Sequence, residues 1–382
     1  MNIVKANSPY LRRKDSSNRL MIDVIIALAP VVIFSLVIYQ LYALRNILVS
    51  VAVMELCEFG FVMIKNRIPY DGEKHTFKEK WTHSIAGYRL NNFLTTMVSA
   101  LIFAMLMPPS SEPGGIIWAA LICGALFGSI IGKLVFGGTG KNVFNPAAVG
   151  VVFAYICFSS YFRYPGSTLM YEVSSESLID ATLTPLSNIV STNAAGGLSY
   201  DLSSYSVLDL FPGSYPSEIG ISCAICIIVG FVYLVVRHAA DFRITLSYVG
   251  TYAVLMLFAG IIVHAGDSSV GIGDFLGYQL LTGGVLFGAV YMATDPVTSP
   301  MTRPGKLIYG AVLGVCTAMI RLFGSVQCIA YSILLGNIAT YVIDYPRWSH
   351  DRYGWKNLLA LGIIIVCALL IVVWALCTEV FA

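Results

Sequence analysis

A glycine-rich stretch is the first group of residues whose types and spacing suggest chemistry. It reads Phe136-Gly-Gly-Thr-Gly-Lys-Asn-Val-Phe-Asn-Pro146, with three glycines in four positions. Glycine lets the backbone approach a ligand closely, and the amides of such a turn can form an anion-binding concavity. Asn142 and Asn145 would share one face of a turn and could hold a polar heterocycle. The stretch is neither a Walker A loop nor a Rossmann fingerprint, so a structural re-entrant turn and a ligand site both fit it.

A second stretch, Met292-Ala-Thr-Asp-Pro-Val-Thr-Ser-Pro-Met-Thr-Arg-Pro304, places an acid directly before a proline. The helix that precedes it must break there, because the residue before a proline is disfavoured in helical conformation. Asp295 can cap the backbone amides exposed at such a break. A carboxylate in this position could equally line an ion path, and the sequence does not separate the two roles.

Further acids lie inside or at the edges of long apolar runs. An acidic side chain at membrane depth costs free energy, so such residues are functional candidates by default. Glu55 and Glu58 lie near the middle of one run, one helical turn apart, whereas Asp23 and Asp344 lie at run ends, where solvation would account for them. Glu55 is therefore the stronger candidate of the four.

Cysteine and histidine do not form a recognisable metal site. Cys223 and Cys226 make one Cys-x-x-Cys pair, and no second pair completes a set of four ligands. The five histidines show no metal-ligand spacing, and no nucleophile motif is present. The sequence therefore predicts neither a metal centre nor a catalytic residue of its own.

The composition shows what kind of protein must position these residues. Of 382 residues, 57% are hydrophobic and 12% are charged, about half of the roughly 25% charge of a soluble domain. This excludes a disordered chain, a nucleic-acid binder and an ordinary cytosolic enzyme. The chain is predicted to be an all-α polytopic membrane protein whose surroundings are a lipid bilayer.

Eleven apolar runs are candidates for membrane-spanning helices, which need about 20 such residues. They are Ile22–Gln40, Tyr42–Ile64, Phe93–Met107, Ile116–Leu134, Ala147–Ser160, Ile219–Val236, Ile244–His264, Leu276–Ala293, Leu307–Phe323, Cys328–Ile343 and Leu358–Leu376. Two of them contain a short echo, Gly124-Ala-Leu-Phe-Gly128 and Gly284-Val-Leu-Phe-Gly288. An internal repeat and glycine-mediated helix packing both explain it.

The basic residues predict the orientation, because positively charged loops stay in the cytoplasm. With the N-terminus inside, 20 of the 23 Lys and Arg residues lie in cytoplasmic segments or at a cytoplasmic helix end, the exceptions being Arg45, Arg163 and Arg321. The chain then divides into residues 1–160 with five helices, a loop 161–218, residues 219–344 with five helices, and residues 345–382 with one further helix. The 161–218 loop and the C-terminus lie outside, and a loop of this length is usually functional.

These stretches together resemble the D subunit of the Rnf electron-transport complex and its paralogue, the B subunit of the sodium-pumping NADH:quinone reductase. The resemblance runs through Asn7-Ser-Pro-Tyr, Met107-Pro-Pro, Gly137-Gly-Thr-Gly-Lys-Asn-Val-Phe-Asn-Pro-Ala147, Ala293-Thr-Asp-Pro-Val-Thr298 and Ile343-Asp344. It covers about residues 7 to 344. It implies a ten-helix core, to which residues 345–382 add an eleventh transmembrane helix.

The resemblance implies a flavoprotein that carries FMN in a phosphodiester bond to a threonine of the long outer loop. The corresponding segment is Leu178-Ile-Asp-Ala-Thr-Leu-Thr-Pro-Leu186, in which Thr184 matches the acceptor. Leu183 stands where the family has alanine, and the spacing from Asp180 is about two residues shorter than in the family. Thr182 is therefore a competing acceptor, although Thr184 is favoured.

The resemblance also assigns roles to the other stretches. A second flavin, riboflavin in the paralogue, is expected beside Gly138, Lys141, Asn142 and Asn145. Passage of Na⁺ or H⁺ is expected to use Glu55, Asp295 and Asp344.

The function that the resemblance implies is that of one membrane component of an ion-translocating ferredoxin:NAD oxidoreductase in a prokaryotic cell membrane. It would relay electrons through the covalent FMN, while partner subunits supply the iron–sulfur and NADH sites and a flavin transferase installs the cofactor. This chain alone would hold no complete active site and would bind no nucleic acid. Two alternatives stay open: a B-type subunit of the quinone reductase, and a secondary transporter or channel without a redox cofactor.

Overall fold

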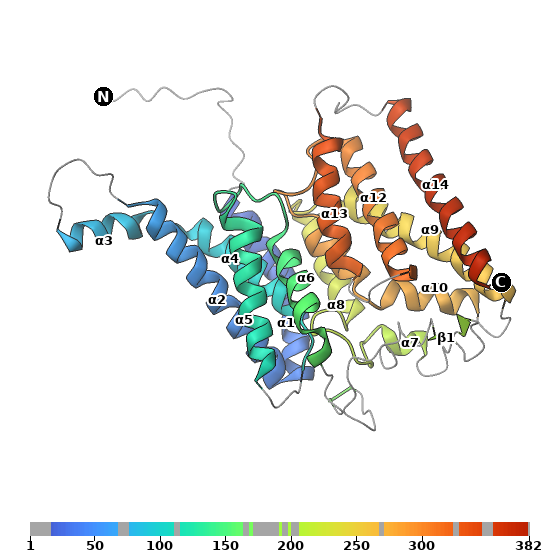
Figure 1. The fold of residues 1–382 in the computed structure, drawn as a ribbon, viewed down its shortest axis with the longest axis horizontal. Coiled ribbons are helices and arrows are strands. Elements are labelled where there is room, and N and C mark those ends of the chain that lie inside the picture. The colour runs from blue at the N-terminus through green and yellow to red at the C-terminus, as the bar shows by residue number, and fades with distance from the viewer. Residues whose placement is uncertain are drawn as a thin grey trace.

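The computed structural model describes residues 17–67, 76–110, 115–162, 168–170, 191–192, 198–199, 206–266, 271–323, 328–345 and 354–380. Its α-helices (Figure 1) are α1 (Ser17–Tyr39), α2 (Leu41–Lys65), α3 (Phe77–Ala86), α4 (Leu90–Leu106), α5 (Ile116–Ser129), α6 (Pro146–Phe158), α7 (Val207–Leu210), α8 (Ala224–Val236), α9 (Phe242–Gly266), α10 (Ile272–Leu281), α11 (Val285–Phe287), α12 (Arg303–Phe323), α13 (Cys328–Ile343) and α14 (Trp355–Val380). Two π-helices, η1 (Ile130–Leu134) and η3 (Gly288–Met292), continue α5 and α11, and η2 (Ser159–Tyr161) is a 3₁₀ turn. The short strands β1 (Ser191–Thr192) and β2 (Leu198–Ser199) pair antiparallel.

The helices confirm the all-α polytopic fold, and each of the eleven predicted runs contains a helix or consecutive helices, although the run Ile219–Val236 becomes helical only at Ala224. Six helices are long and apolar enough to cross a membrane, and two bent pairs raise this number to eight. One bent pair is α3 with α4, at 64°, and the other is α10 with α11 and η3, at 51°. Three further apolar helices, α6 with η2, α8 and α13, are shorter.

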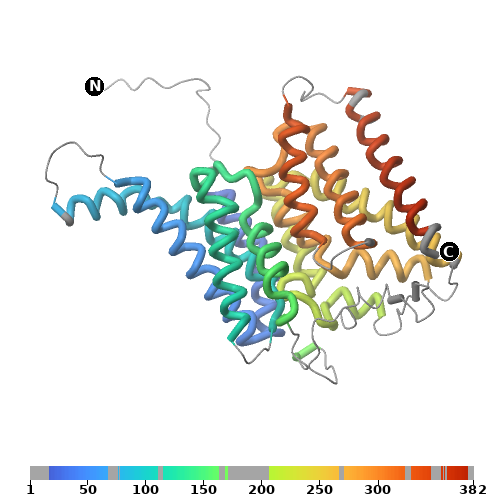
Figure 2. The backbone as a smooth tube through the Cα atoms, viewed as in Figure 1, coloured from blue at the N-terminus to red at the C-terminus, as the bar shows by residue number. Residues whose placement is uncertain are grey.

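The helices form two groups that lie side by side, blue to green and yellow to red in Figure 2. In the first group α2 packs against α4, and α5 packs against α6; in the second, α9 packs along α12, and α12 against α13. The groups meet where α1 packs against α8 and where α6 packs against α13. α3 extends away from the first group, and α14 covers α9 and α12 at the far edge of the second (Figure 1).

The segment 215–223 has no helical structure, although every one of its residues is buried. Its backbone is completed by other elements: the Gly220 N–H donates to the carbonyl of Met105 (2.7 Å), and the Ser35 hydroxyl donates to the carbonyl of Ile219 (2.9 Å). Irregular backbone at membrane depth is tolerated only where protein or a cavity satisfies its polar groups. Here the end of α4 and the middle of α1 supply the hydrogen-bond partners.

Both copies of the glycine echo lead into a π-helix. Gly128 lies two residues before the start of η1, and Gly288 is the first residue of η3. Both glycines allow close packing: a Cβ on Gly128 would lie 2.5 Å from the Pro146 carbonyl oxygen, and one on Gly288 would collide with the side chain of Ile329. Single-turn π segments inside helices occur frequently at functional sites.

Candidate functional site

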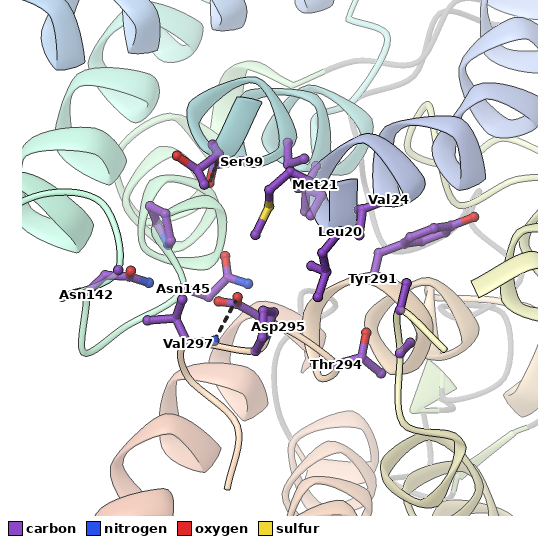
Figure 3. Close-up of a pocket in the computed structure, with 18 of the residues that line it drawn as sticks. Leu20, Met21, Val24, Ser99, Asn142, Asn145, Tyr291, Thr294, Asp295 and Val297 are labelled. Atoms are coloured by element: carbon purple, nitrogen blue, oxygen red, sulfur yellow. Dashed lines mark hydrogen bonds between the residues drawn. The ribbon is translucent and has the colours of Figure 1, made fainter. Parts of the chain in front are cut away.

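The turn that follows η1 and the turn that follows η3 meet at one pocket (Figure 3). The first turn contributes Asn142 and Asn145, and the second contributes Asp295. Figure 3 shows these side chains around the same space, with α1 closing one side through Leu20 and Met21. The cavity volume is about 60 Å³, below the about 300–1,000 Å³ of small-molecule sites. A ligand of that size would therefore also occupy the part that is open to solvent or would displace side chains of the wall.

Apolar side chains from several helices make up most of the pocket wall. They come from α1, α4, α8 and η3 and include Leu20, Met21, Val24, Val98, Ile102, Leu234 and Val290. The polar groups are fewer and come mainly from the two turns. An apolar pocket with a few convergent polar groups is the usual form of a cofactor site.

Asn145 has a structural role and a free group. Its Oδ1 accepts hydrogen bonds from the amides of Ala147 (3.0 Å) and Ala148 (3.4 Å), so it caps the N-terminus of α6, with Pro146 as the first helical residue. Within the part of the chain that the structure describes, its Nδ2 has no hydrogen-bond partner. The capping function therefore leaves one amide donor for a ligand. Asn142 is anchored through its Nδ2, which donates to the carbonyl of Phe144 (3.2 Å).

Gly138 and Lys141 shape the glycine turn, and Gly140 is the residue of this turn that lines the pocket beside the two asparagines. Gly138 has a φ of 90° and its amide donates to the carbonyl of Lys133 (3.2 Å). A Cβ at Gly138 would lie 3.0 Å from the ring of Phe61. The Lys141 amide closes the turn by donating to the Gly138 carbonyl (3.1 Å).

Asp295 caps the break after η3. Its Oδ1 accepts the amide of Val297 (3.2 Å) and its Oδ2 accepts the hydroxyl of Thr298 (3.1 Å). Burial raises the pKa of the Asp295 carboxyl; these two hydrogen bonds and the positive charge of Lys133 oppose that rise. Asp295 is thus both a cap and a pocket carboxylate within electrostatic reach of a cation.

A buried ion pair borders the pocket. The Lys133 ammonium lies 3.1 Å from Glu58 Oε2, and the two side chains are 4% and 0% exposed. The ammonium also donates to the Thr96 hydroxyl (2.8 Å). Glu58 Oε1 accepts the Thr139 hydroxyl (2.9 Å) and the Asn92 amide (3.1 Å). The pair therefore connects α2, α4 and η1 to the glycine turn, and Lys133 also lines the pocket.

Glu55 lies one turn away from this pair and is half-buried. Its Oε2 accepts the hydroxyl of Tyr88 (2.6 Å), and among the described residues its buried Oε1 has no hydrogen-bond partner. It does not line the pocket. The pattern favoured Glu55 over Glu58, whereas the structure gives Glu58 the deeper position and the charge partner. The signal for Glu58 is Lys133, a cation inside an otherwise apolar run.

Asp344 and Asp23 hold elements together rather than facing the pocket. Asp344 Oδ2 accepts the amide of Met301 (3.0 Å), which ties the end of α13 to the turn that carries Asp295. Asp23 is 6% exposed, so the interpretation that solvent accounts for it is wrong. Its Oδ1 accepts the hydroxyl of Tyr233 (3.0 Å) and Nε of Arg237 (3.2 Å), and this joins α1 to α8.

The predicted FMN acceptors, Thr184 and Thr182, lie outside the described residues. Cys223, from the Cys-x-x-Cys pair, accepts the amide of Cys226 on its sulfur (3.4 Å) at the start of α8. Among the residues that the structure describes, no three His, Cys, Asp or Glu side chains are grouped so that they could hold a metal ion.

Comparison with known proteins gives a consistent set of relatives. The model of the NQR2, RnfD, RnfE family matches residues 4–350. The chain is 29% identical to the D subunit of the Na⁺-translocating ferredoxin:NAD⁺ oxidoreductase complex of Acetobacterium woodii, over 93% of this chain and 96% of that protein. It is 27% identical to the D subunit of the proton-translocating ferredoxin:NAD⁺ oxidoreductase complex of Clostridium ljungdahlii, over 89% and 92%. It is 34% identical to the B subunit of the Na⁺-translocating NADH-quinone reductase of Chromohalobacter salexigens, over 68% of this chain and 59% of that protein.

Proposed function

We propose a function from the premise that the chain belongs to the NQR2, RnfD, RnfE family. On this proposal it is the D-type subunit of an ion-translocating ferredoxin:NAD oxidoreductase complex. The D subunits of A. woodii and C. ljungdahlii align over nearly their whole length, whereas the B subunit of C. salexigens aligns over 59% of its own. These coverages favour the D type over the B type. The coarser assignment, a multi-pass membrane component of an ion-translocating oxidoreductase, follows from either set of relatives.

The observation that carries the proposal is the convergence of two distant motifs on one pocket. Residues 137–146 and 293–298 belong to different helix groups, yet Asn142, Asn145 and Asp295 line the same space. The residues present fit a flavin: apolar side chains could cover its ring system, and the asparagine amides could meet its polar edge. Lys133 adds a positive charge at the wall.

A flavin would supply one- and two-electron redox chemistry, and the protein would supply position and electrostatics. Asn145 would orient the ring with the amide donor that capping leaves free. The positive charge of Lys133 would favour additional negative charge on a ligand in the pocket, although Glu58 shares that charge. A plain secondary transporter would have no need of such a constellation, which is why we rank that alternative last.

The covalent FMN would be attached to Thr184, with Thr182 as the alternative acceptor, outside the membrane where the positive-inside pattern predicts the 161–218 loop. Na⁺ or H⁺ passage would draw on Glu55, Asp295 and Asp344. Partner subunits would supply iron–sulfur and NADH sites, a flavin transferase would install the FMN, and the complex would lie in a prokaryotic cell membrane.

Peptide mass spectrometry of the chain co-expressed with a flavin transferase tests the covalent site. We expect an FMN adduct on the peptide that contains Thr184, lost in Thr184→Ala and kept in Thr182→Ala. An adduct that persists in Thr184→Ala would move the site to another residue. A peptide without any adduct from a fully matured complex would remove the covalent flavin from the proposal.

Two substitutions of Asn145 test the second flavin. Asn145→Asp keeps a side-chain oxygen that can cap α6 but removes the amide donor, whereas Asn145→Ala removes both. We expect both variants to lose the flavin that acid precipitation releases. Only Asn145→Ala should also lose stability, by about 1 kcal/mol, the usual value of an N-cap. Flavin content that Asn145→Asp leaves unchanged would contradict a ligand role for this side chain.

A further inference from the structure

A second cavity opens where α8 ends and where α9 and α12 begin. Its volume is about 280 Å³ and its polar lining includes His238, Asp241, Arg243, Ser299 and Lys306. It adjoins the first pocket, because the short linker after α8 and the turn after η3 border both. The proposed redox function makes no use of it.

The charges around this cavity are unequal. Among the described residues that line it, the one carboxylate is Asp241, which lies 2.9 Å from the Lys306 ammonium and 3.3 Å from the Arg243 guanidinium. Burial alone would raise the pKa of Asp241, but the hydrogen bonds and charges of these two cations outweigh burial and lower it, so the carboxylate is ionised. Two cations thus share one anion, and one positive charge is left over beside the imidazole of His238. Both cations are partly exposed.

The backbone at this place is held in an uncommon conformation. His238 has a φ of 54°, in the left-handed region that residues other than glycine rarely adopt. Such outliers cluster at ligand sites, where the surrounding structure holds them in place. Here the conformation turns the chain from α8 into the cavity rim, and the N-terminus of the 25-residue helix α9 follows four residues later.

Exposed apolar side chains lie on the two helices that border the cavity. α8 and α9 are joined by only five residues, yet α8 packs against α1 and α9 packs against α12, so the two helices diverge. Phe242 (44% exposed) lines the cavity, and Val236 (70%) and Leu246 (59%) each lie two residues along the chain from a lining residue, on α8 and α9. A phosphate group would satisfy the excess positive charge, and hydrocarbon chains would cover the exposed apolar side chains.

We propose that this cavity binds the phosphate headgroup of an anionic phospholipid, with its acyl chains over Val236, Phe242 and Leu246. Basic pockets between transmembrane helices on the cytoplasmic side are suited to such headgroups, and the positive-inside pattern predicts this end of the bundle on that side. The site is independent of the redox proposal, because it requires only the membrane fold and the charges described above.

Native mass spectrometry of the full chain in detergent, after removal of bound lipid, tests the proposal with phosphatidylglycerol, phosphatidylcholine and inorganic phosphate as probes. We expect phosphatidylglycerol to bind as one tightly held molecule and phosphatidylcholine to bind more weakly. Arg243→Gln is the main test variant, because it removes one positive charge and leaves the Lys306–Asp241 ion pair in place. It should weaken phosphatidylglycerol binding about fivefold, which corresponds to about 1 kcal/mol per basic residue. Arg67→Gln, an exposed cation away from the cavity, is the control and should change nothing.

Three results would overturn the site. Equal binding of both lipids would show that the acyl chains alone are responsible. Unchanged phosphatidylglycerol binding in both Arg243→Gln and Lys306→Gln would place the lipid elsewhere. Inorganic phosphate that displaces phosphatidylglycerol at equal concentration would assign the cavity to a soluble phosphate instead.

Discussion

Lys133 lies between the acids of the first helix group and the pocket. It lies within contact of Glu58 and within electrostatic reach of Glu55 and Asp295, and it lines the pocket itself. A buried ion pair is weak evidence for stability, because desolvation cancels much of the attraction between the charges. Because Lys133 also lines the pocket, we propose that the pair sets the electrostatic potential at the pocket wall.

A double-mutant cycle tests whether Lys133 and Glu58 act as a coupled pair. Lys133→Met alone leaves Glu58 buried without its cation, and we expect a loss of about 3–5 kcal/mol in the free energy of unfolding. Glu58→Gln alone has a similar effect on Lys133. The double variant should lose less than the sum of the two, with a coupling of about 0.5–3 kcal/mol. Additive losses in thermal unfolding would mean that the two side chains act independently.

At the residue scale the sequence identified each pocket residue as a candidate, but it did not predict that these residues line the same pocket. Residue type and the nearby proline or glycines single out Asn142, Asn145 and Asp295. Asp295 caps the helix break, one of the two roles considered for it, and it also lines the pocket, whereas its role in an ion path stays a prediction. Asn145 lines the same pocket and also caps α6, a role that the sequence did not indicate. Gly138 and Lys141 belong to the same turn but shape it. Spacing along a chain cannot tell which side of a tight turn faces a cavity.

At the scale of elements, the two π-helices define the site. η1 and η3 each continue a helix that carries the glycine echo, and each delivers the chain to a turn that lines the pocket. The echo is visible in five residues of sequence, but the insertion of a π turn is not. A π-helix differs from an α-helix by about one residue per turn, and side-chain periodicity over five residues does not resolve this difference.

Gly128→Ala is expected to disturb η1 and the start of α6. The added Cβ would lie 2.5 Å from the Pro146 carbonyl oxygen, so backbone must move, at a cost of about 1–3 kcal/mol. Gly250→Ala in α9 is the matched control, because its Cβ meets nothing within 4 Å. That control should be neutral or stabilising by up to about 1 kcal/mol, since alanine favours helix. Thermal unfolding in detergent compares them, and equal midpoints would contradict the packing argument.

At the scale of the whole molecule, the fold class followed from composition and apolar runs because a membrane helix is long and its signal is strong. What the runs could not supply is how the helices pack. The pocket needs α1, α4 and α6 from one group and α8 and η3 from the other, and these contacts depend on interlocking side chains rather than on hydropathy. The irregular segment 215–223 overlaps the predicted start of the span Ile219–Val236. A buried segment is apolar whether or not it is helical, so composition could not tell that this part lacks a helix.

The helix α14 packs on α9 and α12 and contributes no described residue to either cavity. Deleting residues 346–382 should therefore lower the thermal midpoint, because the faces of α9 and α12 lose their cover, while the flavin content stays unchanged. Flavin analysis and thermal unfolding of the shortened chain measure both effects. Loss of the non-covalent flavin on this deletion would show that α14 supports the pocket from a distance.

The buried segment 215–223 also bears on how the protein is made. The Gly220 amide finds its acceptor on Met105, in a helix synthesised long before it. An amide without an acceptor costs several kcal/mol in lipid, so this segment cannot leave the insertion machinery for open bilayer on its own. We therefore expect the second helix group to assemble against a first group that is already in the membrane. The two groups are made in succession, and in the folded state this segment joins them through hydrogen bonds.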